Sequence, residues 1–128
     1  MPIDPFPAAR YNEGGSGEAM LRVSFLYYEE CPSHETALAR LREVLAEERI
    51  AADIEIVRVE MDDQAQQLAF VGSPTIRIEG RDIDPPPPGA QYALTCRAYR
   101  RADGRISPLP PQEMIRRALR NAMGEAHR

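Results

Sequence analysis

The chain has 128 residues and a formal net charge of −4, and all sixteen of its basic residues are arginine. This length suits a single domain with a core of its own. The acidic balance, without a basic stripe interleaved with aromatic residues, argues against nucleic-acid binding. No window approaches the length of a membrane span, so no membrane partner is expected. Two cysteines, Cys31 and Cys96, are too few for a disulfide scaffold.

The first nineteen residues differ from the remainder. They combine three prolines with the run Gly14-Gly15-Ser16-Gly17 and show no apolar periodicity. They lack the basic start and apolar stretch of a signal peptide. We therefore predict a flexible leader over 1–19, one domain over 20–124, a short tail over 125–128 and a cytoplasmic location.

Seven segments of regular structure follow in the order β-α-β-α-β-β-α. Alternating apolar residues predict the first strand, and leucines at helical spacing predict the first helix. The expected strands are 21–28, 54–59, 75–79 and 92–99, and the expected helices are 35–49, 64–70 and one that starts near 110–113. Asp62-Asp63 is expected to cap the second helix and Gly72 to end it. Four prolines, 85–88, predict a stiff extended connector between the last two strands.

This order predicts an α/β fold. Two strands separated by a helix are most simply parallel neighbours, whereas two joined without a helix are most simply antiparallel. A mixed four-stranded sheet with helices on both faces follows.

Two short motifs carry the chemistry. Cys31-Pro32-Ser33-His34 stands where the first strand gives way to the first helix, and Gly72-Ser73-Pro74-Thr75 opens the third strand. With the order of elements, they make residues 21–123 resemble the thioredoxin-like superfamily in its glutaredoxin-sized form. The resemblance implies a cis Ser73–Pro74 bond. It also implies a substrate groove shaped by Ser73, Pro74 and Thr75, where the backbone before the proline pairs with an extended substrate segment.

The chain departs from the superfamily at the fourth position of the first motif. His34 replaces the second cysteine of Cys-x-x-Cys, so no neighbouring thiol is available to resolve a mixed disulfide. The motifs also look like those of a bacterial group of small thioredoxin-like proteins associated with organomercury lyase names. That likeness adds soft-metal or organomercurial binding as an alternative function.

Cys31 is the first candidate for a reactive thiol. The start of a helix favours the thiolate, whereas the adjacent Glu29 and Glu30 disfavour a further negative charge. His34 could stabilise that thiolate as imidazolium, accept its proton as a neutral base, or simply face water. Cys96, on the predicted last strand, could be a resolving partner, a second metal ligand or a small buried hydrophobic residue.

We therefore expect a thiol–disulfide oxidoreductase if the protein is an enzyme. Cys31 would attack a disulfide, and an external thiol or Cys96 would resolve the mixed disulfide. The partner would be a protein or a low-molecular-weight thiol or disulfide, and the protein a monomer or weak homodimer. No cofactor is expected and no metal site is assigned. A redox-inert thioredoxin-like scaffold is the remaining alternative.

Overall fold

The computed structural model describes residues 11–12, 20–101 and 103–126. It contains three helices in this part of the chain: α1 (His34–Glu48), α2 (Asp62–Leu68) and α3 (Gln112–Ala126). The strands are β1 (Tyr11–Asn12), β2 (Leu21–Tyr27), β3 (Ala52–Arg58), β4 (Thr75–Ile78), β5 (Arg81–Asp82), β6 (Tyr99–Arg100) and β7 (Ile106–Ser107).

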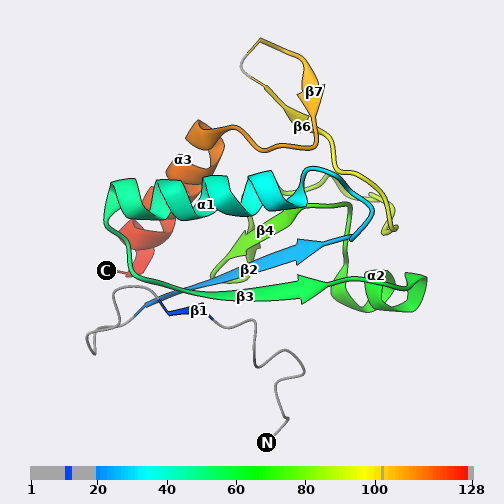
Figure 1. Cartoon of the computed structure of the whole chain (residues 1–128), viewed down its shortest axis with the longest axis horizontal. Coiled ribbons are helices and arrows are strands. Elements are labelled where there is room, and N and C mark those ends of the chain that lie inside the picture. The colour runs from blue at the N-terminus through cyan, green and yellow to red at the C-terminus, as the bar shows by residue number, and fades with distance from the viewer. Residues whose placement is uncertain (1–10, 13–19, 102, 127–128) are drawn as a thin grey trace, which may run out of the picture.

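The main sheet has the strand order β1-β3-β2-β4-β5 (Figure 1). Strands β2 and β3 are parallel and are joined through α1, whereas β4 lies antiparallel to β2 on its other side. Strand β5 returns antiparallel beside β4. The mixed four-stranded core β3-β2-β4-β5, reached in the order β-α-β-α-β-β and followed by a last helix, is an α/β fold of thioredoxin-like topology. Both the fold class and the mixed sheet predicted from the sequence are confirmed.

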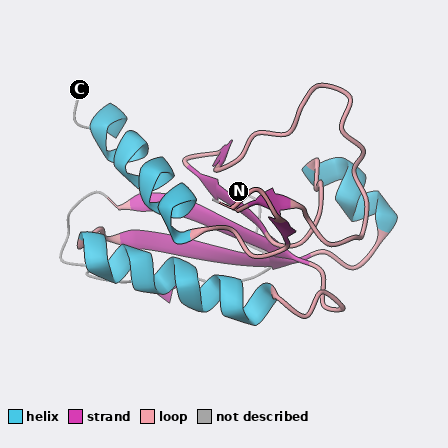
Figure 2. Cartoon of the chain, turned by 90° about the horizontal axis from the view of Figure 1, so that it is seen from above, coloured by secondary structure: helices cyan, strands magenta, loops and turns pink. Residues whose placement is uncertain are grey.

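Alternation along the strands separates two hydrophobic layers. Val23 and Phe25 point from β2 toward α1 and α3, which pack together over one face of the sheet (Figure 2). Leu26 belongs to a smaller cluster on the opposite face, with Ala65 of α2 and the following Phe70. Helices therefore cover both faces, as the apolar residues on both sides of β2 predict.

The helix boundaries agree with the prediction to within a few residues. Helix α1 ends where Arg49 adopts a left-handed conformation, and α2 ends in the same way at Ala69, before the predicted Gly72. Arg77 of β4 donates hydrogen bonds to the carbonyl oxygens of Leu68 and Ala69, so the end of α2 is fastened to the sheet. Helix α3 begins within the predicted window, at Gln112.

The prediction of a fourth sheet strand over 92–99 is wrong. The fourth strand of the core is β5, which follows β4 through the two-residue turn Glu79-Gly80, with φ of 53° and 81°. Two successive positive φ values are the signature of a tight hairpin turn. Glutamate is unusual at the first position of such a turn, so the sequence does not predict the turn. The four prolines therefore follow the last strand of the main sheet and do not connect two of its strands.

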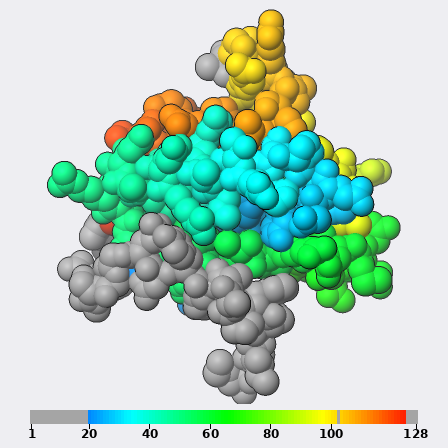
Figure 3. Space-filling model, viewed as in Figure 1, coloured from blue at the N-terminus to red at the C-terminus, as the bar shows by residue number. Residues whose placement is uncertain are grey.

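Most of segment 92–99 is irregular. Only Tyr99 continues into a strand, β6, which pairs with β7 in a separate small hairpin. This hairpin stands out from the body of the molecule beyond the start of α3 (Figure 3).

Two further predictions concern the ends of the chain. Within the predicted leader, Tyr11 and Asn12 form β1 and pair antiparallel with Ile54 and Asp53 of β3. The rest of that leader, 1–10 and 13–19, lies outside the described residues. In the predicted tail, α3 continues through Ala126, and 127–128 are not described. In the described part of the chain, no helix is both long enough and apolar enough to cross a membrane.

Candidate functional site

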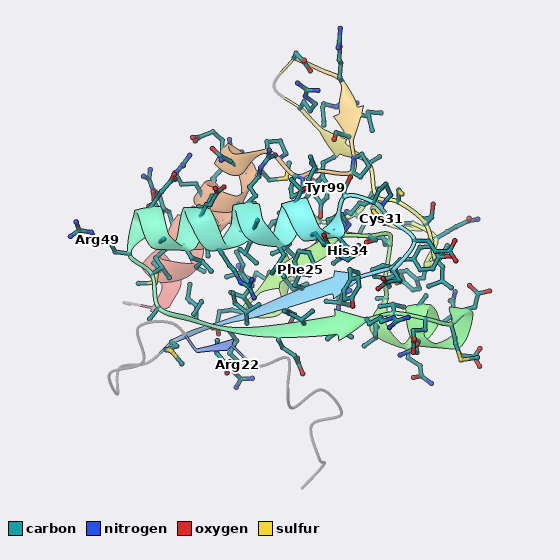
Figure 4. The ribbon with its side chains drawn as sticks, in the orientation of Figure 1. Arg22, Phe25, Cys31, His34, Arg49 and Tyr99 are labelled. Atoms are coloured by element: carbon teal, nitrogen blue, oxygen red, sulfur yellow. The ribbon has the colours of Figure 1, made fainter. Side chains whose placement is uncertain are left out.

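Cys31 lies at the carboxyl end of β2, in the connection to α1. A tight turn, closed by the Cys31 N–H donating to the carbonyl of Tyr28 at 2.9 Å, reverses the chain after the strand. Helix α1 begins at His34 with Ser33 at its cap, so Cys31 and Pro32 precede the first helical turn rather than forming part of it. Figure 4 shows Cys31, His34 and Tyr99 together at this end of the sheet.

The Ser73–Pro74 peptide bond is cis, as the resemblance to the thioredoxin-like superfamily implied. It places Ser73 against Cys31, whose thiol donates to the Ser73 carbonyl oxygen with an Sγ–O distance of 3.5 Å. Both residues are completely buried. The Ser73 hydroxyl is also buried, and within the described residues it has no hydrogen-bond partner.

Cys96, in the segment before β6, also lies beside Ser73. It forms an isolated parallel β-bridge with Ser73. The Ser73 N–H donates to the carbonyl of Thr95, and the Arg97 N–H donates to the carbonyl of Ser73, both at 2.8 Å. Ser73 is thus the shared neighbour of the two cysteines, although 64 residues separate Cys31 from Cys96 (96 − 31 − 1).

The two cysteines differ sharply in exposure. Cys31 is 0% exposed, whereas Cys96 is an exposed residue. Surrounding chain still covers part of Cys96, since burial is the largest cause that raises the pKa of its thiol. A side-chain hydrogen bond with Cys31 and the charge of a Cys31 thiolate raise the pKa of Cys96 further. Both cysteines therefore lie beside Ser73, Cys31 through its thiol and Cys96 through the β-bridge.

Arg97 fixes the segment that carries Cys96. Its guanidinium is buried and pairs with Asp82 of β5 at 2.8 Å, and it also donates to the carbonyl of Asp84. It lies 4.7 Å from the centre of the Tyr99 ring, within reach of a cation–π interaction. The neighbouring residue across the bridge, Gly72, has no side chain, and a Cβ there would lie 2.9 Å from Arg97 Cα. Cys96 is therefore held beside Ser73 by its neighbour in the sequence.

Thr75 and Pro74, predicted to line a substrate groove, are occupied within the chain. The buried Thr75 hydroxyl donates to the carbonyl of Gly72 at 2.6 Å and accepts from Arg97 at 3.3 Å. The Pro74 carbonyl accepts a hydrogen bond from the buried Tyr99 hydroxyl at 2.6 Å. Burial raises the pKa of Tyr99 far above its usual range, so it remains a neutral donor.

His34, Glu29 and Glu30 flank Cys31 in the sequence, and each interacts with a neighbouring side chain. The His34 ring stacks on Tyr27 with centroids 4.5 Å apart. Glu29 and Glu30 are exposed, and Glu29 lies 3.9 Å from the Arg58 guanidinium, which offsets part of its charge. Burial, followed by the charge and hydrogen bond of Glu30, raises the pKa of Tyr28, so the second glutamate is also engaged locally.

Arg97 and Tyr99 are the residues of this site that sequence reasoning missed. Arg97 stands in a run with Arg100 and Arg101, and such a run reads as a solvated loop. In the structure Arg97 is buried, whereas Arg100 and Arg101 are exposed. One local feature of the sequence could have indicated that Arg97 is buried: it stands two residues before Tyr99, so the two side chains face the same side. This feature is informative only once Asp82 is known to lie opposite Arg97.

Comparison with known proteins found no matching family model, no matching curated protein and no matching solved structure. In the described residues, no group of three or more histidine, cysteine, aspartate or glutamate side chains is arranged to hold a metal ion. The two thiols and their surroundings are therefore the features that indicate the chemistry of this site.

Proposed function

We propose that this protein is a thiol–disulfide redox protein of the thioredoxin-like superfamily, and that its redox pair is Cys31 and Cys96. One observation carries the proposal: both cysteines lie against Ser73, beside the cis proline. The missing second cysteine of a Cys-x-x-Cys motif is thus supplied from a distant part of the chain.

The reaction that this pair supports is a two-electron exchange. The dithiol form gives two electrons and two protons to a disulfide, which becomes two thiols, and a bond forms between the sulfurs of Cys31 and Cys96. The reverse reaction passes through a mixed disulfide with an external thiol. A disulfide requires Cα atoms within roughly 7 Å, so bridge formation requires residues 95–97 to bring Cys96 to Cys31.

The test is the mass and connectivity of the oxidised protein. Wild-type protein treated with an excess of a disulfide should lose the mass of two hydrogen atoms, and peptide mapping should link Cys31 with Cys96. Cys31→Ser and Cys96→Ser are matched controls, and neither should form an intramolecular bridge. Oxidised wild-type protein that carries only mixed disulfides, with no Cys31–Cys96 link, would refute the proposal.

His34 is proposed to tune this pair. It lies three residues after Cys31, at the first position of α1, and its ring stacks on Tyr27, which fixes its position. His34→Phe keeps a stacking ring but removes both ring nitrogens. We expect slower formation of the Cys31–Cys96 bridge in this variant with little change in the free energy of unfolding. An unchanged rate would leave His34 with a stacking role alone.

Soft-metal or organomercurial binding is a second candidate, favoured by the placement of both cysteines beside Ser73. Thiolates are the preferred ligands of such metals. A binding protein of this kind should take up one Hg²⁺ per chain with loss of both free thiols, and either cysteine variant should lose this tight binding. Wild-type affinity no higher than that of the single-cysteine variants would exclude a two-thiol metal site.

A further inference from the structure

Residues 95–97 and the Cys31 thiol use both backbone hydrogen-bonding groups of Ser73. The resemblance to the superfamily implied that the backbone of Ser73 would pair with an extended substrate segment. In the structure, the N–H of Ser73 donates to Thr95, and its carbonyl oxygen accepts from Arg97 and from the Cys31 thiol. A carbonyl oxygen has two lone pairs, so neither backbone group of Ser73 has capacity left for a substrate backbone. Residues 95–97 therefore take the place that a substrate peptide would fill.

The exposure of the two cysteines is the reverse of what a reactive Cys31 and a buried Cys96 would require. Cys31, the residue of the Cys-Pro-Ser-His motif, is 0% exposed, whereas Cys96 is exposed at the centre of segment 95–97. A reagent that arrives from solvent reaches Cys96 first. Access to Cys31 requires local opening of the structure around Ser73, where the Arg97–Asp82 ion pair and the Arg97 bond to the Asp84 carbonyl hold residues 95–97 in place.

We infer that Cys96 is the thiol that exchanges with the external partner, that Cys31 resolves the mixed disulfide from within, and that the partner is a low-molecular-weight thiol or disulfide rather than an extended polypeptide. This inference rests on the proposed function. It assigns the order of the two cysteines and the class of partner, which the proposed function leaves open.

The steps balance as ordinary thiol–disulfide exchange. The Cys96 thiolate attacks a small disulfide, RSSR, forms a Cys96–SR mixed disulfide and releases RS⁻. Cys31 then loses its proton and attacks the Cys96 sulfur, which breaks the bond to SR and releases a second RS⁻. The two protons given up by the cysteines end on the two released thiolates. The net result is one intramolecular disulfide, with RSSR reduced to two RSH.

The reverse direction uses the same order. A small thiolate attacks the exposed Cys96 sulfur of the intramolecular disulfide, and Cys31 is the leaving group.

The experiment measures which sulfur captures a small disulfide. Cys31→Ser and Cys96→Ser proteins, each with one thiol, are mixed with excess oxidised glutathione, quenched at intervals with acid and analysed by intact mass. Serine at position 31 retains a hydroxyl that can donate to the Ser73 carbonyl, and Cys31→Ala serves as a second variant if the serine protein does not fold. We expect Cys96 in Cys31→Ser to be modified faster by about tenfold or more than Cys31 in Cys96→Ser, because access controls the rate of exchange.

A denatured control assigns any difference to the fold. In concentrated urea the two single-thiol proteins should react at similar rates. Equal rates in the folded state, or faster capture at Cys31, would overturn the inference. The proposed function would survive that result as long as wild-type protein still forms the Cys31–Cys96 bridge. Failure of wild-type protein to form the bridge would instead remove the proposed function, whichever single thiol reacts faster.

The class of partner is tested on the Cys31→Ser protein. Its rate with oxidised glutathione is compared with its rate toward an extended peptide of matched charge that carries a mixed disulfide with glutathione. We expect the small disulfide to react faster, since the backbone of Ser73 cannot pair with the peptide. Faster reaction with the peptide would show that residues 95–97 leave the groove readily and would overturn the assignment of a small partner.

Discussion

Ser73 and Cys96 are paired as neighbours in an isolated parallel β-bridge, although they come from the start of a sheet strand and from an irregular segment. The same Ser73 carbonyl that accepts from the backbone after Cys96 also accepts from the Cys31 thiol. One peptide unit therefore connects the two cysteines. Substitutions that disturb this connection should therefore change both the free energy of unfolding and the reactivity of the two thiols.

The first prediction concerns the ionisation of Cys96. Burial raises the pKa of its thiol, and the hydrogen bond and charge of Cys31 raise it further. Cys31→Ser removes the thiolate charge, so the pKa of Cys96 should fall. The pH midpoint of Cys96 alkylation, measured peptide by peptide, should be lower in Cys31→Ser than in wild-type protein. A midpoint that does not move would show that Cys31 has no electrostatic contact with Cys96.

Gly72 should be intolerant of a side chain. Its φ of +138° is strained for other residues, and a Cβ would lie 2.9 Å from Arg97 Cα and 3.0 Å from Arg97 N. Gly72→Ala should displace residues 96–97, lower the free energy of unfolding and slow formation of the Cys31–Cys96 bridge. Chemical denaturation and oxidation kinetics measure the two effects.

Gly80→Ala is the matched control for Gly72→Ala. Gly80 also has a positive φ, +81°, but no atom lies within 4 Å of a Cβ built there. This substitution should cost about 1–2 kcal/mol from left-handed backbone strain alone and leave the rate of bridge formation unchanged. Equal losses of stability and equal oxidation rates in the two variants would exclude crowding against Arg97 as the cause.

Arg97 should be essential for the position of Cys96. The side chains of Arg97 and Asp82 are only 6% and 10% exposed, so Arg97→Ala leaves a buried carboxylate without its partner. We expect the free energy of unfolding to fall by about 3–5 kcal/mol and the Cys31 thiol to become accessible to alkylation. The exposed Arg100 is the control, and Arg100→Ala should change stability by no more than about 0.5 kcal/mol. Equal effects of the two substitutions would contradict an anchoring role for Arg97.

Ser73→Ala should affect the free energy of unfolding and the rate of Cys31–Cys96 bridge formation differently. The Ser73 hydroxyl is buried and, among the described residues, lacks a hydrogen-bond partner. A buried unpaired hydroxyl costs about 1–3 kcal/mol, so alanine should keep or increase the free energy of unfolding. If the hydroxyl donates to a thiolate during exchange, the same variant should form the Cys31–Cys96 bridge more slowly. A less stable Ser73→Ala protein would show that the hydroxyl is satisfied in solution.

Local patterns determined most of the fold. The alternation of Val23, Phe25 and Tyr27, with Leu26 on the other side, predicts a strand with apolar contacts on both faces. The leucines of α1 predict the helix that follows. Helix α3 follows from the same kind of periodicity. The fourth strand could not be found in this way, because β5 has only two residues and depends on a turn in which Glu79 adopts an uncommon positive φ. Residues 92–99 alternate like a strand, yet no strand of the main sheet lies beside them as a partner.

The sequence by itself identified Cys31, Cys96 and the Ser73–Pro74 element, because each stands out by residue type and by its place relative to a predicted strand or helix. Which of these residues meet was decided only by tertiary structure. Cys96 comes to Ser73 through the burial of Arg97 against Asp82, an interaction between two segments that local periodicity cannot relate. Exposure was decided there as well: packing against the Ser73 backbone leaves the cysteine of the motif buried and the distant cysteine open to solvent.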